Sequence, residues 1–586
     1  SILSVTLFSI KINSLAKVLN DNTDGSLFVD DFGVSCRGKY MPTIERQLQL
    51  VLNKINKWAL ENGFKFSKAK TNCVHFCNQR KVHSDPDLYL DKTPIKVVPQ
   101  AKFLGIIFDN KLSFIPHIKE LKAKCLKALD LLKVLSNTNW GGDEETLLHL
   151  YRSLIRSKLD YGSIIYGSAR PSYIKMLDTI HHQGLRLCLG AFRTSPVESL
   201  YVEANEPSLE DRRIKLTLQY ITKLKANPSN PAYNCVFHPE YKQLYESKPR
   251  AIPPLGIRIQ QHVEESDVNL QPIAKHSLLS FPPWQSVETN VDLSLTRFKK
   301  SKTNELTFQQ AFNELRDQYP DHRAIYTDGS KDGRTVAAAA VTPSKTLASR
   351  LHDGSSIFTA EAKAILLSLQ HIIKSTHTQY IIFSDSLSCL QAIKNCKTDH
   401  PIIRDILTLL NQHHDNYIIF CWLPSHMGIR GNSKADAAAK SALESDHISS
   451  TKIPYTDSKP DIKSYIKHRW QSHWDEQDNN KLHSITPHLG YFPLSSFSRR
   501  EAVVLRRCRI GHSHFTHSYL LKGEDPPECI ACQCPLTIKH ILLECGDTRL
   551  VRDDFYSSTS MQDLFSRVGG QQVLAFLKAV CLFDKI

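Results

Sequence analysis

The fold of this chain is decided by IYTDGS at residues 325–330, followed by FTAEAKAILLSLQHII at 358–373, YIIFSDS at 380–386 and WLPSHMGIRGNSKADAAAKSA at 422–442. The first and third stretches contain short apolar runs, which predict strands that end near an Asp. The second and fourth have the spacing of helices and carry Glu361 and Asp436. The alternation of strands and helices predicts an α/β domain over residues 321–445.

Four carboxylates lie in these stretches, namely Asp328, Glu361, Asp385 and Asp436. Singly, they have ordinary explanations as a turn residue, a charge in the first turn of a helix, an N-cap and a solvated helix residue. Together, acids that converge from strand ends and helices would repel one another unless cations bound between them. Two Mg²⁺ ions, or Mn²⁺ in their place, would suit such an all-oxygen site and support in-line displacement at a phosphodiester.

The motifs TDGS, TAE, SDS and PSHMGIRGNSKAD resemble, in order and spacing, those of type 1 ribonucleases H. The resemblance implies a mixed five-stranded sheet with helices, in which the four acids bind the metals. It implies that His426 assists proton transfer or product release, and that Ser330 and Asn432 support the acids and contact nucleic acid. One departure is Ser433, where the family usually has Glu, at a position that binds no metal.

The N-terminal region contains SLFVDDFGVSC at 26–36, where Asp30 and Asp31 separate two apolar runs and predict the tip of a hairpin. A plain polar hairpin tip is the alternative. This segment resembles the catalytic hairpin of reverse transcriptases from non-LTR retrotransposons. Three further stretches resemble motifs of the same family: SILSVTLFSIKINSL at 1–15, GFKFSKAKTNCVHF at 63–76, which carries Lys70 as a nucleic-acid contact, and FLGIIFDNKLSFIPHI at 103–118, similar to a Leu-Gly hairpin.

This second resemblance implies a partial polymerase palm over residues 1–115 and a helical thumb over 116–230. The prolines of residues 231–320 predict a linker with some local packing and an extended backbone. The apolar run at 103–108 predicts a buried strand. The spacing from His117 to Val134 predicts a helix with a basic face, which is either an ordinary solvated surface or a face that follows nucleic acid. The family's first catalytic Asp would precede this chain, so we expect the C-terminal part of a polyprotein similar to jockey-like elements, unable to polymerise by itself.

The C-terminal region predicts a polar connector over residues 446–490 and a basic Cys/His module over 491–586. Its pattern Cys529-x2-Cys532-x7-His540-x4-Cys545 suits tetrahedral Zn²⁺. Reduced cysteines in a small apolar core are the alternative. The preceding stretch SRREAVVLRRCRIGH at 498–512 predicts a basic helix. Its side chains are expected either to face nucleic acid or to pack against their own domain; those assigned to nucleic acid are Arg506, Arg507 and Arg509.

Composition agrees with a protein that binds polyanions. The chain has 586 residues, 74 Lys+Arg against 59 Asp+Glu, and a formal net charge of +15. Fifteen cysteines, an odd number spread along the chain, favour a reduced intracellular protein. No uninterrupted apolar stretch approaches ~18 residues, so we expect no membrane span. The expected partners are RNA–DNA hybrids, retroelement RNA and target DNA, in a ribonucleoprotein of the nucleus and cytoplasm that the resemblance implies.

The leading hypothesis is therefore an enzyme that hydrolyses the RNA strand of RNA–DNA hybrids, attached to an N-terminally truncated RNA-directed DNA polymerase. A catalytically inactive nucleic-acid-binding remnant is the alternative, and the complete set of four acids argues against it. A stand-alone cellular ribonuclease H is a third reading, which the ordered polymerase motifs in residues 1–118 oppose.

Overall fold

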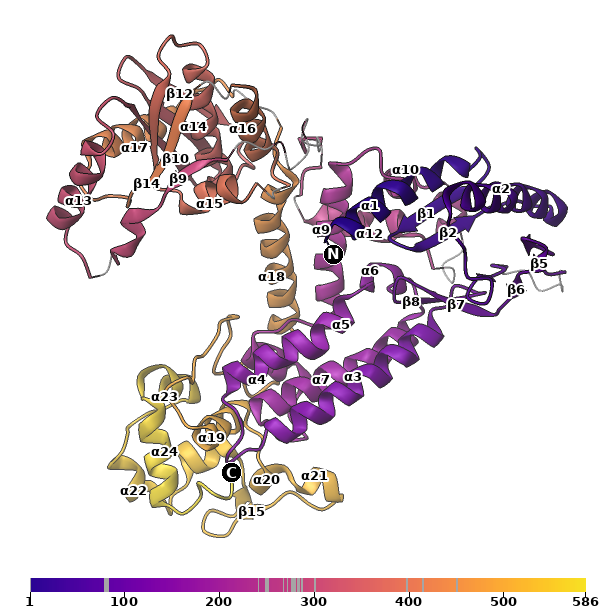
Figure 1. Cartoon of the computed structure of the whole chain (residues 1–586). Coiled ribbons are helices and arrows are strands. Elements are labelled where there is room, and N and C mark those ends of the chain that lie inside the picture. Colours follow the sequence, from indigo (N-terminus) through magenta and orange to yellow (C-terminus); the bar gives the residue numbers. More distant parts are fainter. Residues whose placement is uncertain are drawn as a thin grey trace. The chain divides into compact units, whose positions relative to one another are not determined.

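The structure is a computed structural model (Figure 1). It divides into two compact units: Ser1–Arg213 with Tyr245–Pro253 and Trp470–Ile586, and Ile214–Leu244 with Pro254–Arg469. Within the described residues, no helix combines the length and apolar character needed to cross a bilayer. The residues described are 2–77, 84–240, 242–247, 252–266, 268–270, 272–275, 281, 285, 288–299, 302–396, 399–413, 416–448 and 452–586.

A six-stranded mixed sheet forms the centre of the second unit, which confirms the α/β prediction. The first three strands are antiparallel, and the remaining neighbours pair in parallel. The sheet has one strand more than the five expected. The additional edge strand, β9, has only three residues, too few for a periodic pattern to reveal it. The order across the sheet is β12 (Thr346–Leu351), β11 (Thr335–Val341), β10 (Arg323–Asp332), β13 (Gln379–Ser384), β14 (Tyr417–Trp422) and β9 (Asn290–Asp292).

Both faces of this sheet are buried. Side chains alternate along a strand, so Ile382 of β13 packs in one apolar cluster while Ile381 and Phe383 pack in another. Burial on both sides explains why β13 reads as a continuous apolar run. The helices of this region are α13 (Glu305–Asp317), α14 (Ile357–Ile372), α15 (Leu387–Asn395), α16 (Pro401–Gln412) and α17 (Arg430–Ala442).

The segment expected to be a linker, 231–320, supplies folded elements, as does the expected connector at 446–490. Helix α12 (Leu255–Glu265) shares an apolar cluster with α9 (Leu209–Lys225) and α18 (Lys459–Asp475). The prolines that suggested extended chain have another role here. Pro254 stands directly before α12, where its fixed φ is compatible with a helix start.

The N-terminal part of the first unit contains the predicted Asp-Asp hairpin, formed by β1 (Asp24–Phe28) and β2 (Asp31–Ser35). The hairpin packs with α1 (Ile2–Asn13) and α2 (Met41–Asn62) in one apolar cluster. The strand predicted at 103–108 is instead the turn and second arm of another hairpin. Its strands are β7 (Gln100–Phe103) and β8 (Ile106–Asp109), and the two turn residues between them, Leu104 and Gly105, both have positive φ.

Helices occupy most of residues 115–225, as the pattern predicts. The main ones, α3 (Ile115–Leu135), α4 (Glu144–Tyr151), α7 (Pro171–Leu189) and α8 (Val197–Ala204), enclose an apolar core that also contains Ile510. That residue ends α19 (Arg499–Ile510), so the C-terminal module is packed into the same unit. The module continues with α20 (His514–His517), α21 (Tyr519–Lys522), β15 (Glu528–Cys529), β16 (Cys534–Pro535), α22 (Arg549–Asp553), α23 (Met561–Arg567) and α24 (Gly570–Ala579).

Candidate functional site

Two of the four predicted acids are brought together by the parallel pairing of β10 and β13. Thr327 of β10 is in register with Ser384 of β13, and Asp328 and Asp385 are the residues that follow them. The hydroxyl of Thr327 donates a hydrogen bond of 3.1 Å to the Phe383 carbonyl, which ties the two strands together at this point. Asp328 is 6% exposed, so its carboxylate lies at the buried centre of the site.

Helix α14 brings Glu361 to the same place. The helix begins at Ile357, so Glu361 is its fifth residue. The sequence pattern instead predicts a position in the first turn. Close packing against β10 depends on Gly329, where a Cβ atom would lie 2.8 Å from the Glu361 backbone nitrogen. A backbone hydrogen bond from Gly329 lowers the pKa of Glu361, but burial and the neighbouring acids outweigh it.

The electrostatics of the cluster suit a cation. One oxygen each from Asp328, Glu361 and Asp385 lie within 4.8 Å of one another. Burial, followed by the charges of Asp385 and Asp436, raises the pKa of Asp328 to about 8. Burial and the charge of Asp385 raise the pKa of Glu361 well above its usual value. Glu361 Oε2 is buried without a hydrogen-bond partner, so these oxygens fit a divalent metal ion such as Mg²⁺.

Asp436, the fourth predicted acid, lies outside this group of three. It is carried by α17, and its Oδ2 forms an ion pair of 2.8 Å with Lys440 one turn later. Its charge nevertheless reaches the cluster, because it contributes to the raised pKa values of Asp328 and Asp385. No motif points to Lys440, although its spacing of four residues from Asp436 is typical of helical ion pairs.

The loop between β14 and α17 contributes His426, and the first turn of α17 contributes Asn432. His426 is exposed and has a φ of 56°. Burial raises the pKa of Asp385, and the charge of His426 offsets part of that rise. Gln309 of α13 supports the loop through a hydrogen bond of 3.2 Å from its Nε2 to the Met427 carbonyl. Asn432 is only 5% exposed, and its side chain is hydrogen-bonded to Asp385. It therefore holds an acid in place, which leaves little surface for the expected contact with nucleic acid.

Ser330 lies on β10 two residues after Asp328, so the two side chains leave the same face of the strand. It is half-buried. Of Ser330 and Asn432, the two residues predicted to support the acids, only Ser330 keeps a partly solvent-accessible side chain beside them.

The Asp-Asp hairpin has the predicted shape, and Asp30 and Asp31 belong to none of the potential metal groups found among the described residues. Asp30 lies in the turn and Asp31 begins β2, opposite Phe28, and both are exposed. Among the described residues, no third carboxylate, His or Cys joins them in a potential metal group. Lys70 is also exposed, in a turn where its backbone nitrogen donates to Ser67.

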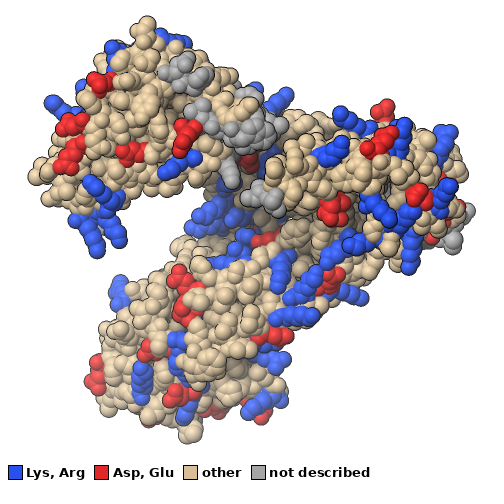
Figure 2. Space-filling view, in the orientation of Figure 1, with Lys and Arg blue, Asp and Glu red and all other residues tan. Residues whose placement is uncertain are grey.

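Basic side chains gather on α3 and around a neighbouring cavity. Figure 2 shows blue side chains along the region where α3 lies in Figure 1. A cavity of about 290 Å³ is lined by Lys102, Lys124 and Lys158 together with the single acid Glu120. His117 also lines it, and the Nε2 of that buried ring has no hydrogen-bond partner. The exposed or half-exposed lysines of the helix are Lys119, Lys122, Lys124, Lys127 and Lys133.

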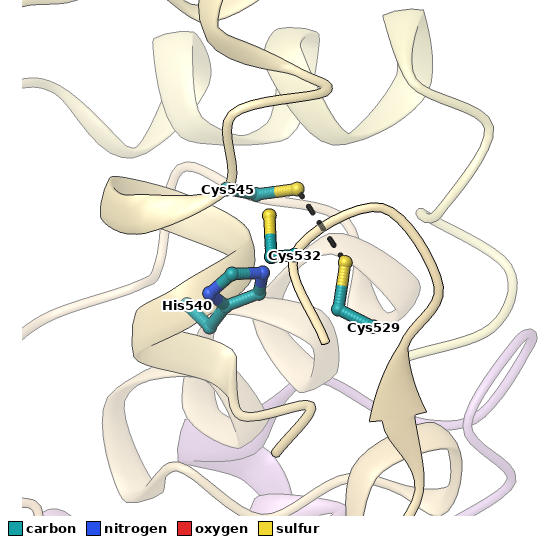
Figure 3. Close-up of side chains that lie close together, drawn as sticks. All are labelled: Cys529, Cys532, His540 and Cys545. Atoms are coloured by element: carbon teal, nitrogen blue, oxygen red, sulfur yellow. Dashed lines mark hydrogen bonds between the residues drawn. The ribbon is translucent and has the colours of Figure 1, made fainter. Parts of the chain in front are cut away.

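The predicted zinc ligands converge (Figure 3). The ligand atoms of Cys529, Cys532, His540 and Cys545 lie within 4.8 Å of one another. A π-helical turn makes this possible, since the Cys545 nitrogen donates to the His540 carbonyl at 2.8 Å and places both side chains on one side. The sulfurs of Cys529 and Cys545 are 3.9 Å apart, near the ~3.8 Å expected for tetrahedral zinc thiolates. The donor set fits Zn²⁺.

The basic helix α19 corrects one expectation. Arg506 is 0% and Arg509 3% exposed, and both pair with Glu203 of α8. Arg507 is half-buried, and it donates to the Gly190 and Ile586 carbonyls. These arginines therefore pack α19 against its own unit, which is the second of the two roles that the sequence predicts for this helix. The sequence could not distinguish the two because the partner acids lie about 300 residues away.

Comparison with known proteins assigns the class of the central domain. Residues 320–444 match the family model described as RNase H, so this part of the chain is similar to ribonuclease H domains. The fold and the order of the acids agree with that assignment.

The chain is also similar to polymerases of mobile elements. It is 27% identical over 167 residues to the probable RNA-directed DNA polymerase from transposon X-element of Drosophila melanogaster, covering 28% of this chain and 18% of that protein. It is 24% identical over 245 residues to the RNA-directed DNA polymerase from mobile element jockey of the same species, covering 40% and 26%. The predicted resemblance to non-LTR retrotransposon proteins is confirmed. The matched part is a minor share of each relative's length.

Proposed function

We propose that residues 321–445 hydrolyse the RNA strand of RNA–DNA hybrids. The observation that carries this proposal is the cluster of Asp328, Glu361 and Asp385, with ligand oxygens within 4.8 Å and one buried Glu361 oxygen unpartnered. Buried acids without cationic partners are costly, and their retention together is typical of sites that bind divalent ions. The match of this part of the chain to the RNase H family supports the choice of substrate.

The roles of the residues follow from their positions. Asp328, Glu361 and Asp385 bind Mg²⁺, with Asp436 available beside them; when bound, the metal ions stabilise the charge that develops on the attacking and leaving oxygens. Asn432 orients Asp385 through its hydrogen bond. His426, exposed on its loop near Asp385, moves a proton at the edge of the site.

The remainder of the chain supplies binding and structure. We propose that the basic face of α3 and the lysine-lined cavity beside it hold the nucleic-acid backbone, since phosphate contacts of this kind are sequence-independent. The Cys/His cluster binds a structural Zn²⁺. We propose that the N-terminal region belongs to an RNA-directed DNA polymerase, and that the protein acts in a nuclear and cytoplasmic ribonucleoprotein.

The experiment offers the purified chain a labelled RNA–DNA hybrid with Mg²⁺, beside single-stranded RNA and duplex DNA. Cleavage of the hybrid's RNA strand alone, abolished by a chelator, is the expected result. Tight binding to the hybrid without any cleavage would replace this proposal with the inactive binding remnant.

A further inference from the structure

Asp457 lies in a short helical turn, η5 (Tyr455–Ser458), beyond the part of the chain that matches the RNase H family. Despite that position it is 4% exposed. Its carboxylate is directed at the start of α14, the helix that carries Glu361. The contact joins residues about 100 positions apart, and it involves both carboxylate oxygens.

The contacts form a cap supplied from outside the helix. Asp457 Oδ2 accepts hydrogen bonds from the Ser356 backbone nitrogen at 2.9 Å and from Thr359 Oγ1 at 2.6 Å. Asp457 Oδ1 accepts a bond of 2.9 Å from Ser356 Oγ. Ser356 is itself the N-cap of α14, because its hydroxyl accepts from the Thr359 backbone nitrogen at 3.2 Å. A carboxylate at this end of a helix is also favoured by the helix dipole.

The segment that carries Asp457 is fastened to the same unit by its backbone. Ile453 donates to the Pro272 carbonyl at 2.7 Å and accepts from the Ala274 nitrogen at 2.8 Å. Ile453 is buried, and its side chain lies against Gly354, two residues before the N-cap Ser356. A carboxylate held in this way can fix the helix start rather than follow its motion.

We propose that Asp457 is a positioning residue for the acidic site, which holds the first turn of α14 so that Glu361 reaches Asp328 and Asp385. Glu361 follows Thr359 by two residues, and its backbone is packed against Gly329 of β10. Loosening the helix start would therefore move the Glu361 carboxylate relative to its partners. The inference rests on the proposed function for its effect on cleavage, but its structural part stands independently.

The test compares Asp457→Ala with Asp446→Ala in the full chain, since Asp446 is an exposed acid of the same connecting segment. Mn²⁺ is the probe, because it occupies all-oxygen sites, and the Asp328→Asn variant supplies the blank for binding elsewhere. We expect Asp457→Ala to weaken Mn²⁺ binding about tenfold, the loss typical of residues that orient metal ligands. kcat for hybrid cleavage should fall similarly with KM unchanged, while Asp446→Ala matches the parent chain.

Hydrogen exchange separates positioning from general destabilisation. In Asp457→Ala the amides at the start of α14 should exchange faster, whereas those of β13 keep their protection. Asp457→Asn, which retains one acceptor oxygen, should give intermediate values. Ser356→Ala should shift the same readouts, and its effect should not add to that of Asp457→Ala because the two residues share one network.

Unchanged Mn²⁺ affinity and unchanged exchange at the start of α14 in Asp457→Ala would overturn the proposal. If Asp457→Ala does not fold, Asp457→Asn and Ser356→Ala decide by the same readouts. If the parent chain cleaves no hybrid, the proposed function fails, but Mn²⁺ binding and helix exchange still decide whether Asp457 positions the acids.

Discussion

Arg506 and Glu144 lie 362 residues apart in the chain and form a bidentate ion pair in its interior. Arg506 Nε is 2.8 Å from Glu144 Oε2, and Nη2 is 2.7 Å from Oε1. Glu203 pairs with the same guanidinium, and Arg509 pairs with Glu203. The network joins α19 of the C-terminal module to α4 and α8, so these segments form one body within the first unit.

Breaking this network should loosen the C-terminal module. Glu144→Gln leaves a buried Arg506 charge less well compensated, and loss of one partner of a buried pair costs about 3–5 kcal/mol. The adjacent exposed residue on α4 provides a matched control, Glu145→Gln. We expect chemical denaturation to show an earlier transition for Glu144→Gln only. Equal midpoints for the two variants would contradict a stabilising role for the ion pair.

Zinc binding is expected to depend on four ligands and on none of the exposed thiols. Cys545→Ser should lose bound Zn²⁺ and should unfold residues 526–546 locally, because structural zinc contributes directly to folding. Cys581, exposed and outside the cluster, supplies the control Cys581→Ser. Zinc content by atomic spectroscopy and circular dichroism measure the outcome. A parent chain that binds no zinc, with a spectrum unchanged by chelator, would support the apolar-core alternative.

Acid should destabilise the helical core through His181. Burial, chiefly, lowers the pKa of His181 to about 3, and its Nε2 lies 3.1 Å from the Pro207 carbonyl, to which it donates. The unfolded chain takes up this proton near pH 6.5, whereas the folded protein does so only near its lowered pKa. His181 therefore leaves the free energy of unfolding unchanged above about pH 6.5. Below that pH it lowers the free energy of unfolding by about 1.4 kcal/mol per pH unit.

His181→Gln removes one titrating group from that dependence. Unfolding midpoints measured between pH 7 and 4 should fall less steeply for this variant than for the parent chain. His149, on the same group of helices but exposed, supplies the control His149→Gln. An identical slope for His181→Gln and the parent would show that the buried imidazole does not carry the acid sensitivity.

The parts of the site that the sequence could predict are those encoded by short local motifs. Asp328, Glu361 and Asp385 each sit beside a strand or helix whose apolar pattern is complete within a few residues. Asp457 has no such context, because its role arises from a contact about 100 residues away. The same physical reason applies to Arg506, whose buried environment is created by acids that its own helix does not contain.

Prolines and short strands account for the remaining differences. The prolines of residues 231–320 predict a linker, but a proline directly before a helix, such as Pro254, and a proline in a linker look alike in one sequence. The edge strand β9 contributes only Asn290–Asp292. Its pairing with β14 depends on the tertiary fold, so no local propensity reveals it.

The most direct test of the account is Mg²⁺-dependent cleavage of a labelled RNA–DNA hybrid by the parent chain and by Asp385→Asn. We expect the parent to cut only the RNA strand and the variant to lose activity by about a thousandfold or more, since a metal site contributes several kcal/mol to the transition state. Asp332→Asn, an exposed acid of the same domain, should keep full activity. Undiminished cleavage by a folded Asp385→Asn would contradict the assignment of the acidic cluster as the active site.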